Sequence, residues 1–418
     1  MVTTLRFTTS GSVDDGKSTL IGRLLLDSKA LLEDQLAAVK RTSERRGGPA
    51  LDLSLFTDGL TIEREQGITV DVAYRYFATA RRRFIIADTP GHVQYTRNMV
   101  TGASTADLSV ILVDAARGIS EQTRRHAAVA ALLAIPHVVV AVNKMDQVDW
   151  SRAVFEEIAA DFSEIARSLE LNDPRIIPLS ALEGDMVVHR GSRLDWYAGP
   201  TLLEVLETAE RREPAMELRF PVQLVSRSRF GARGDLRGYL GRIESGSLAV
   251  GDLVTAWPQR IEARVVDLVA SGSRAASAGA GQSITVVLDR QVDIARGDVL
   301  THSRDRPTVA RRFGARLTWL DREPLDLARR YALKHGTQFV SASVEQLESR
   351  LDLATLAADT SAERLEFNDL GAVRIAVNRP LVADRYAVNR ATGSFILVDE
   401  ATHHTVAAGM ISELGPHG

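Results

Sequence analysis

The sequence contains no cysteine among its 418 residues. This absence excludes disulfide bridges, thiolate zinc sites and cysteine nucleophiles. Long hydrophobic runs are also missing, since no stretch approaches the roughly 18 consecutive apolar residues that suggest a membrane-spanning helix. The first ten residues include threonine, arginine and serine and lack the apolar core of a secretory signal. We therefore expect a cytoplasmic protein that does not bind a membrane.

An excess of charge of one sign is missing as well. The formal net charge is only −3, so the composition provides no general attraction to nucleic acid, and we expect no nucleic-acid partner. Hydrophobic residues make up 45% of the chain, which is enough for a large buried core. A chain of this length is expected to fold as more than one domain.

Residues 11–18 read GSVDDGKS and fit the phosphate-loop pattern G-x-x-x-x-G-K-[ST]. Gly11 and Gly16 allow the tight curl that aims backbone N–H groups at a triphosphate. Lys17 would place a positive charge between the β- and γ-phosphates, and the Ser18 hydroxyl is a suitable ligand for Mg²⁺. The alternating run at 5–9 predicts a strand before the loop, and apolar residues at helical spacing predict a helix after it.

Two further apolar runs, typical of buried parallel strands, end in polar motifs. The run at 84–87 leads into DTPGH, where Asp88 could hold Mg²⁺ through water and the Gly91 N–H could contact the γ-phosphate. The run at 138–142 leads into NKMD. The carboxylate of Asp146 could accept two hydrogen bonds from guanine, whereas adenine offers no such pair of donors.

A third apolar run, at 175–179, leads into SAL, whose backbone could bind guanine O6. Each later motif alone is weak, but their order and their place after apolar strands predict a doubly wound α/β P-loop GTPase domain that uses GTP and Mg²⁺. The predicted GTP-binding residues are Gly11, Ser12, Val13, Asp14, Asp15, Gly16, Lys17, Ser18, Thr19, Asp88, Thr89, Pro90, Gly91, His92, Asn143, Lys144, Met145, Asp146, Ser180, Ala181 and Leu182.

Three residues are predicted to act in hydrolysis, namely Lys17, Thr69 and His92. Thr69 lies in the run EREQGIT and is interpreted as the switch residue that holds Mg²⁺ together with Ser18 and Asp88. The alternative is an ordinary exposed threonine in a charged loop. His92 is interpreted as the residue that positions the attacking water, the alternative being a histidine packed in a domain interface. No arginine finger is assigned.

The pattern of the chain changes after residue 212. Short β runs with glycine turns between about 219 and 303 predict a closed β-barrel, and β patterning that resumes from about 306 predicts a second one. The predicted domains are therefore 1–212 for GTP binding, 213–305 for the first barrel and 306–418 for the second. The small-residue run at 270–281 is interpreted as a surface loop, and the arginines at 81–83 as a solvated hairpin tip.

The five loops followed by two barrels resemble the translation-factor class of GTPases, the class of elongation factor Tu. The sequence also contains DGLTIEREQGITVDVAYRYF at 58–77, FIIADTPGHVQYTRNMVTG at 84–102, EQTRRH at 121–126, SALEGD at 180–185 and TGSFIL at 392–397. These segments resemble the GTPase large subunit (subunit 1) of bacterial heterodimeric ATP sulfurylase, which is a sulfate adenylyltransferase. That resemblance covers essentially the whole chain, although it is diffuse at 227–235 and 341–364. Asp15 stands where elongation factors typically carry histidine, which favours the sulfurylase branch.

The resemblance implies that this chain hydrolyses GTP while a separate small subunit transfers adenylyl from ATP to sulfate. The products would be adenosine 5′-phosphosulfate and pyrophosphate, in the first step of sulfate assimilation, with GTP hydrolysis driving the uphill reaction. It implies a heterodimer with the small subunit, and a chain that lacks, or ends before, the adenylylsulfate kinase domain fused to some relatives. Two other functions stay open, a translation-type GTPase that delivers aminoacyl-tRNA and a nodulation-type paralogue that activates sulfate for a specialised product.

Overall fold

The computed structural model describes residues 3–30, 53, 71–211, 216–230 and 236–415. The chain divides into two compact units, the first formed by Met1–Arg212 with Asp352–Ala357 and the second by Glu213–Leu351 with Ala358–Gly418. Among the described residues, none of the helices has the length and apolar character that a membrane crossing requires.

The first unit is built on a six-stranded sheet with the strand order β2-β3-β1-β4-β5-β6. Only β2 runs antiparallel to its neighbour, and the other strands are parallel. Strands β4 and β5 are apolar and buried almost throughout, as expected for parallel strands covered on both faces. The strands are β1 (Thr4–Ser10), β2 (Ala73–Ala78), β3 (Arg83–Asp88), β4 (Leu108–Asp114), β5 (His137–Asn143) and β6 (Arg175–Pro178).

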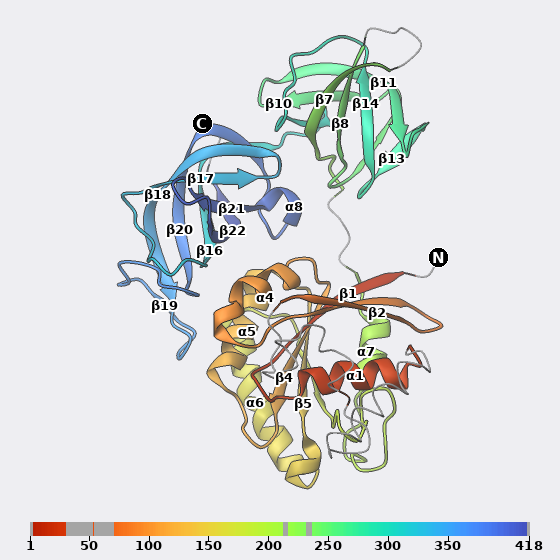
Figure 1. Cartoon of the computed structure of the whole chain (residues 1–418), viewed down its shortest axis with the longest axis vertical. Helices are drawn as coiled ribbons and strands as arrows, with labels where there is room; N and C mark the ends of the chain where they lie inside the picture. Colours follow the sequence, from red (N-terminus) through yellow and green to blue (C-terminus); the bar gives the residue numbers. More distant parts are fainter. Residues whose placement is uncertain (1–2, 31–52, 54–70, 212–215, 231–235, 416–418) are drawn as a thin grey trace. The chain divides into compact units, whose positions relative to one another are not determined.

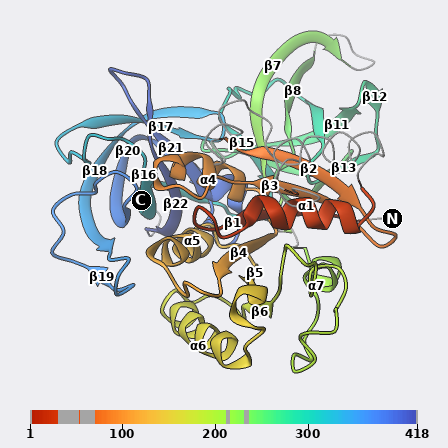
Figure 2. The same cartoon turned by 60° about the horizontal axis from the view of Figure 1, so that its bottom comes forward.

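Helices cover both faces of this sheet, with α4, α5 and α6 on one face and α1 and α7 on the other (Figures 1 and 2). Helix α5 begins with a capping box in which Ser120 and Thr123 bond each other's backbone N–H. The described residues thus form the doubly wound α/β domain that the sequence predicts. The helices are α1 (Lys17–Asp27), α4 (Thr96–Ala103), α5 (Glu121–Leu132), α6 (Arg152–Ser168) and α7 (Leu202–Thr208), with short 3₁₀ turns η2 (Val93–Tyr95) and η3 (Met145–Val148).

The arginine cluster between β2 and β3 departs from its predicted role at one position. Arg81 and Arg83 are exposed, but Arg82 is buried. Its Nη1 donates to the carbonyl oxygens of Leu206 (3.2 Å) and Ala209 (2.5 Å) at the end of α7. Arg82 is therefore not part of a solvated tip, because its guanidinium satisfies carbonyl groups that the last helical turn leaves without intrahelical partners.

The second unit begins with a closed β-barrel of six strands, in the order β10-β15-β7-β8-β14-β11, with β10 pairing back to β11. The run at 270–281 was expected to be a surface loop, but it contains the short strands β12 (Ser273–Arg274) and β13 (Ser277–Gly279), the latter paired with β9 (Ser247–Ala249). The barrel strands are β7 (Phe220–Phe230), β8 (Leu236–Arg242), β10 (Leu253–Trp257), β11 (Ile261–Ala270), β14 (Ser283–Leu288) and β15 (Val299–His302).

A second closed barrel follows, in the order β17-β21-β22-β16-β20-β18, with β17 pairing back to β18. Each barrel has its own buried apolar core, so the prediction of two β-barrels is confirmed. The strands are β16 (Thr308–Trp319), β17 (Arg330–His335), β18 (Gln338–Leu351), β20 (Leu370–Ala383), β21 (Ser394–Asp399) and β22 (Thr405–Leu414), with the small additions β19 (Ala358–Asp359) and α8 (Arg390–Gly393).

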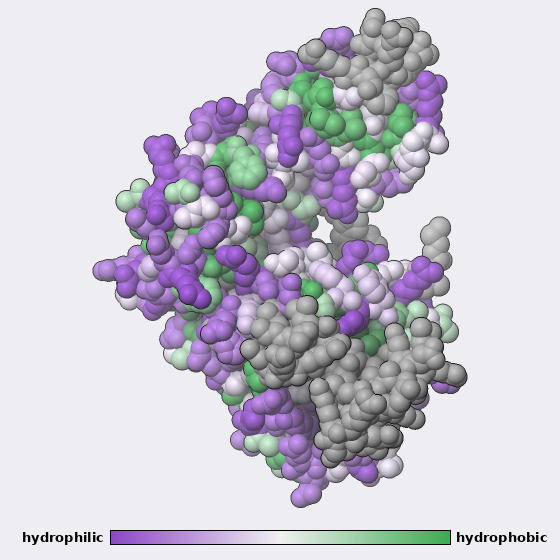
Figure 3. Space-filling view, in the orientation of Figure 1, coloured by the Kyte–Doolittle hydropathy of each residue, from purple (hydrophilic) through white to green (hydrophobic). Residues whose placement is uncertain are grey.

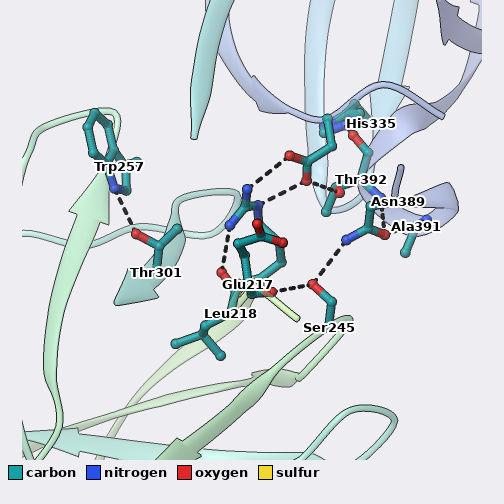
Figure 4. A network of polar contacts seen from close by, with 11 residues as sticks. Glu217, Leu218, Ser245, Trp257, Thr301, His335, Asn389, Ala391 and Thr392 are labelled. Carbon is teal, nitrogen blue, oxygen red and sulfur yellow. Dashed lines mark hydrogen bonds and ion pairs between the residues drawn. The ribbon is translucent and has the colours of Figure 1, made fainter. Parts of the chain in front are cut away.

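A buried polar network joins the two barrels inside the second unit (Figure 4). Arg219 donates from Nε and Nη2 to the two carboxylate oxygens of Asp384, each at 2.9 Å. The Thr392 hydroxyl donates to the same carboxylate at 2.6 Å, and Asn389 Nδ2 donates to Ser245 Oγ at 3.0 Å. On the face that Figure 3 shows, hydrophilic residues cover most of the described surface, with apolar residues between them.

Candidate nucleotide-binding site

The loops that carry the predicted motifs all follow the carboxyl ends of strands in the six-stranded sheet. The register pairs Thr9 of β1 with Asp88 of β3, and Asp114 of β4 with Asn143 of β5. The phosphate loop, the DTPGH loop and the NKMD loop therefore start at neighbouring points of one sheet edge. In open α/β sheets, ligands bind at such an edge, where the strand order reverses.

Glycines make the close approach of these loops possible. Gly16 has a φ of +87° and is the N-cap of α1, so the positive end of that helix faces the loop. A Cβ on Gly16 would lie 2.4 Å from Asn143 Nδ2, and a Cβ on Gly91 would lie 1.9 Å from the Gly11 carbonyl oxygen. A side chain at either position would push apart the loops that must surround a triphosphate.

Lys17 and Asp88 meet at the centre of this edge. The Lys17 ammonium donates to Asp88 Oδ1, and only 9% and 2% of the two side chains are exposed. The Thr89 hydroxyl donates to the Thr9 carbonyl oxygen at 2.7 Å, which fixes the start of the DTPGH loop. A cation and a carboxylate thus converge beside the first turn of α1.

The oxygen groups at this point fit Mg²⁺ in one specific way. Within the described ranges, no group of three or more His, Asp or Glu side chains could hold a metal ion. Mg²⁺ bound with a nucleotide takes most of its ligands from water and phosphate and needs only one or two protein oxygens. The hydroxyl of half-buried Ser18 and the carboxylate of Asp88 are oxygen donors of that kind.

Asp15 turns its carboxylate into the phosphate loop. Oδ2 accepts a hydrogen bond from the Ser12 N–H at 2.7 Å, and the residue is only 4% exposed. Burial raises the pKa of Asp15 to about 6. The Ser12 bond and the charges of Lys144 and Arg117 oppose that rise, while Asp114 adds to it. Sequence reasoning placed Asp15 among the ligand-binding residues and missed its bond to the backbone of its own loop.

Asn143 connects three of the loops. Its Nδ2 donates to the Asp15 carbonyl oxygen at 2.8 Å, and its Oδ1 accepts from the Ala181 N–H at 2.9 Å. Lys144, with a φ of +63°, donates from Nζ to Asp114 Oδ2 at 2.8 Å. These two residues of the NKMD motif thus hold the phosphate loop, the SAL loop and the end of β4 together.

Asp146 lies at the far end of the same edge, where a base would bind. Its Oδ1 accepts from the Ser180 hydroxyl at 2.6 Å, which leaves Oδ2 for a ligand. Arg23 of α1 donates to the carbonyl oxygens of Ala181 (3.2 Å) and Leu182 and so anchors the SAL loop. A carboxylate held in this way is suited to accept a pair of donors from guanine.

His92 is half-buried, and its Nδ1 accepts from the Gln94 N–H at 3.3 Å. Nδ1 is therefore the acceptor nitrogen in this arrangement, so the proton of the neutral ring lies on Nε2.

The remaining predicted residues differ in their exposure. Val13 and Asp14 are exposed at the loop surface, whereas Thr19 is half-buried. Pro90 and Met145 are buried. Thr69 lies outside the described residues.

The first turn of α5 carries contacts that sequence reasoning missed. Ser120 Oγ lies 3.1 Å from Ser12 Oγ, and Gln122 Nε2 donates to the Gly91 carbonyl oxygen at 2.7 Å. From the sequence, the segment EQTRRH was notable only for its resemblance to the sulfurylase family. Ser120 was detectable as a helix N-cap, but its bond to the phosphate loop was not.

Two family models match this chain. The model of the elongation factor Tu GTP binding domain matches residues 3–214, and that of the GTP-eEF1A C-terminal domain matches residues 312–412. The first model covers half of the chain. It includes every loop described above.

Full-length relatives extend the likeness over nearly the whole chain. Sulfate adenylyltransferase subunit 1 of Shewanella woodyi is 47% identical over 97% of this chain, which covers 86% of that protein. The bifunctional enzyme CysN/CysC of Mycobacterium tuberculosis is 48% identical over 98% of this chain, and the bifunctional enzyme NodQ of Rhizobium sp. strain N33 is 49% identical over 97%. This chain spans only 67% and 63% of those two bifunctional proteins.

Proposed function

Because the chain belongs to the sulfate adenylyltransferase subunit 1 family, within the translation-factor class of GTPases, we propose that it is the GTP-hydrolysing subunit of a sulfate-activating enzyme. A partner small subunit makes adenosine 5′-phosphosulfate and pyrophosphate from ATP and sulfate, and GTP hydrolysis in this chain drives that synthesis. The reaction is the first step of sulfate assimilation, and we assign it to the cytoplasm.

The observation that carries the proposal is the meeting of the motif loops at one sheet edge. Lys17 with Asp88 marks the phosphate end, and Asp146 with Ser180 marks the base end. Between them, Asn143 bonds both the phosphate loop and the SAL loop. In this assignment all the predicted nucleotide-binding residues keep their proposed roles, and Asp146 selects guanine because an adenine would leave its carboxylate without a pair of donors.

Hydrolysis of GTP requires charge neutralisation and a positioned water more than covalent chemistry. Lys17 exchanges its bond with Asp88 for the phosphates of GTP, which frees that carboxylate. Ser18 and Asp88 would then hold Mg²⁺, joined by Thr69. When bound, the metal supplies positive charge that stabilises the developing negative charge on the phosphates. His92 orients the attacking water from Nε2.

A partner subunit is part of the proposal, because the relative from Shewanella woodyi is named as subunit 1 of its enzyme. We propose a heterodimer with the small subunit, which contains the sites for ATP and sulfate. The translation-type alternative is not favoured, because relatives that are 45 to 47% identical over 97% or more of this chain are named sulfate adenylyltransferase subunit 1. The domain limits 1–212, 213–305 and 306–418 also remain our proposal.

The test is co-purification with the small subunit, followed by a pyrophosphate-release assay with ATP, sulfate and GTP. We expect a stable complex whose pyrophosphate release depends on sulfate and rises with GTP. Aminoacyl-tRNA binding with no sulfate dependence would instead support the translation-type reading. A complex that forms but releases no pyrophosphate would contradict the proposed activity.

A further inference from the structure

The first turn of α5 contacts the two loops that surround the terminal phosphate in our proposal. Ser120 Oγ lies within hydrogen-bond distance of Ser12 Oγ in the phosphate loop. Two residues later, Gln122 Nε2 donates to the carbonyl oxygen of Gly91 in the DTPGH loop. The helix therefore bonds both loops from the side of the sheet that it covers.

The position of the Gly91 carbonyl affects the orientation of His92, because the backbone around it is tightly packed. The Gly91 backbone packs so closely on Gly11 that no side chain fits there. The Gly91 carbonyl and the His92 N–H belong to the same planar peptide group. Holding the carbonyl oxygen with Gln122 therefore also fixes the direction of the His92 N–H and the point from which the His92 side chain starts.

The orientation of the Gln122 amide is determined by a second bond. Arg125 Nε donates to Gln122 Oε1 at 3.1 Å, and arginine has no acceptor atom. Oε1 must therefore face Arg125, which leaves Nε2 to face Gly91. Arg125 in turn bonds Glu121 Oε1 at 3.1 Å from Nη2, so the amide is held by a chain of bonds within one helical turn.

The next turn of α5 places an uncharged imidazole four residues after Gln122. His126 follows Gln122 by four residues, is 3% exposed, and has its pKa lowered to about 3 by burial, with Arg125 and Lys17 adding to the effect. The imidazole is therefore neutral at pH 7 and does not compete with Lys17 for the phosphates. Gln122 and His126 therefore add no charge to the site.

We propose that Gln122 is a positioning residue for GTP hydrolysis, because its amide fixes the peptide that joins Gly91, whose N–H is proposed to contact the terminal phosphate, to His92, which is proposed to position the water. Through this bond α5 helps the site to distinguish GTP from GDP. The inference rests on the proposed function, specifically on the roles given there to Gly91 and His92. Gln122 itself is proposed to contact neither the phosphate nor the attacking water.

The test replaces Gln122 by Glu in the full chain. Glutamate keeps the size of the side chain and the bond from Arg125, but it presents an acceptor oxygen to the Gly91 carbonyl in place of a donor. We expect kcat for GTP hydrolysis to fall about tenfold, and the affinity for a non-hydrolysable GTP analogue to fall about tenfold relative to that for GDP. GDP affinity should change by no more than about twofold, since GDP lacks the phosphate that the Gly91 N–H is proposed to contact.

Two further variants separate positioning from folding. Gln122→Leu removes the amide without adding charge and should reproduce the loss of GTP selectivity. Glu156→Gln, in an exposed pair with Arg152 on α6, should leave both affinities and kcat near the wild-type values. The melting temperature of each variant is measured in parallel.

The outcomes are distinct. A Gln122→Glu protein with an unchanged GTP-to-GDP affinity ratio overturns the inference, and so does one that loses both affinities equally with a lower melting temperature. If the wild-type chain hydrolyses GTP in either case, the proposed function stands while the role of Gln122 does not. A wild-type chain without GTP binding overturns both.

Discussion

At the scale of single residues, we propose that base selection depends on Asp146. Ser180 holds one carboxylate oxygen, so the free oxygen and its neighbour can accept from the two guanine donors. We expect Asp146→Asn to weaken GTP binding by at least about tenfold and to shift the preference toward xanthosine triphosphate, because the amide donates where the carboxylate accepts. Competition binding with both nucleotides measures this shift. A GTP affinity unaffected by the substitution would remove Asp146 from the base site.

A substitution at His92 should affect catalysis without affecting GTP binding. Because His92 is proposed to position water rather than to hold GTP, His92→Ala should keep GTP affinity within a few-fold while hydrolysis slows by about 10²-fold or more. Single-turnover hydrolysis together with equilibrium binding measures both quantities. Loss of affinity in parallel with the rate would indicate that the imidazole has a structural role.

Asp15 links nucleotide binding to pH. Its pKa in the folded chain is raised to about 6, mainly by burial, from an ordinary value of 3.8. The folded state therefore binds the proton more tightly than the unfolded state, so the stability from protonated Asp15 is complete below pH 3.8 and is lost as the pH rises through about 6. The phosphates of a bound nucleotide add negative charge nearby and should raise this pKa further.

The linked prediction is that nucleotide affinity falls as the pH rises from about 5.5 to 7.5, because binding then requires proton uptake by Asp15. Asp15→Asn, which cannot ionise, should flatten this part of the profile. GDP binding to both proteins across the pH range, with the nucleotide's own ionisation common to the two, isolates the contribution of Asp15. Parallel profiles for wild type and variant would contradict the linkage.

At the scale of elements, the strands that carry motifs were predictable because apolar runs followed by polar turns identify buried parallel strands. The contacts between their loops were not. Asn143 bonds residues 128 and 38 positions away, and such partners depend on the order of strands in the sheet, which local pattern does not encode. The burial of Arg82 was not predictable for the same reason. An arginine in a charged cluster is expected to be solvated, and its contact with α7 depends on how the elements pack.

The contact between the two barrels provides a prediction at this scale. Asp384 is nearly buried and accepts hydrogen bonds from Nε and Nη2 of Arg219. The substitution Asp384→Ala therefore leaves a buried guanidinium without its charge partner. We expect a loss of about 3–5 kcal/mol in the unfolding free energy of the second unit. Replacing both residues together, with Arg219→Met and Asp384→Leu, should cost less, because no buried charge remains.

Thermal unfolding of the full chain, followed by tryptophan fluorescence, measures these changes. The matched control is Arg312→Ala, since Arg312 pairs with Glu345 on the surface of the second barrel and its side chain is 76% exposed. Solvent screens such a pair, so little change is expected there. Equal losses for Asp384→Ala and the double variant would show that packing, rather than the buried charge, determines the stability of this contact.

At the scale of the whole molecule, the family assignment implies that one chain hydrolyses GTP so that another can complete an uphill synthesis. The described part of this chain has one phosphate loop, and its residues are committed to GTP in our proposal. The isolated chain should therefore hydrolyse GTP slowly and make no adenosine 5′-phosphosulfate. Coupling must appear only when the small subunit and its substrates are present, because it is a property of two sites acting on one assembly.

Lys17→Ala tests this coupling directly. The variant should still join the small subunit, since Lys17 is buried rather than on the surface, but it should bind GTP weakly because the proposed phosphate contact is lost. With ATP and sulfate, the wild-type complex should accumulate more adenosine 5′-phosphosulfate when GTP is added, and the Lys17→Ala complex should stay at the yield seen without GTP. Chromatographic measurement of the nucleotide product at equilibrium gives both yields. An equal rise in the two complexes, or product from the isolated chain, would show that GTP hydrolysis at this site does not drive the synthesis.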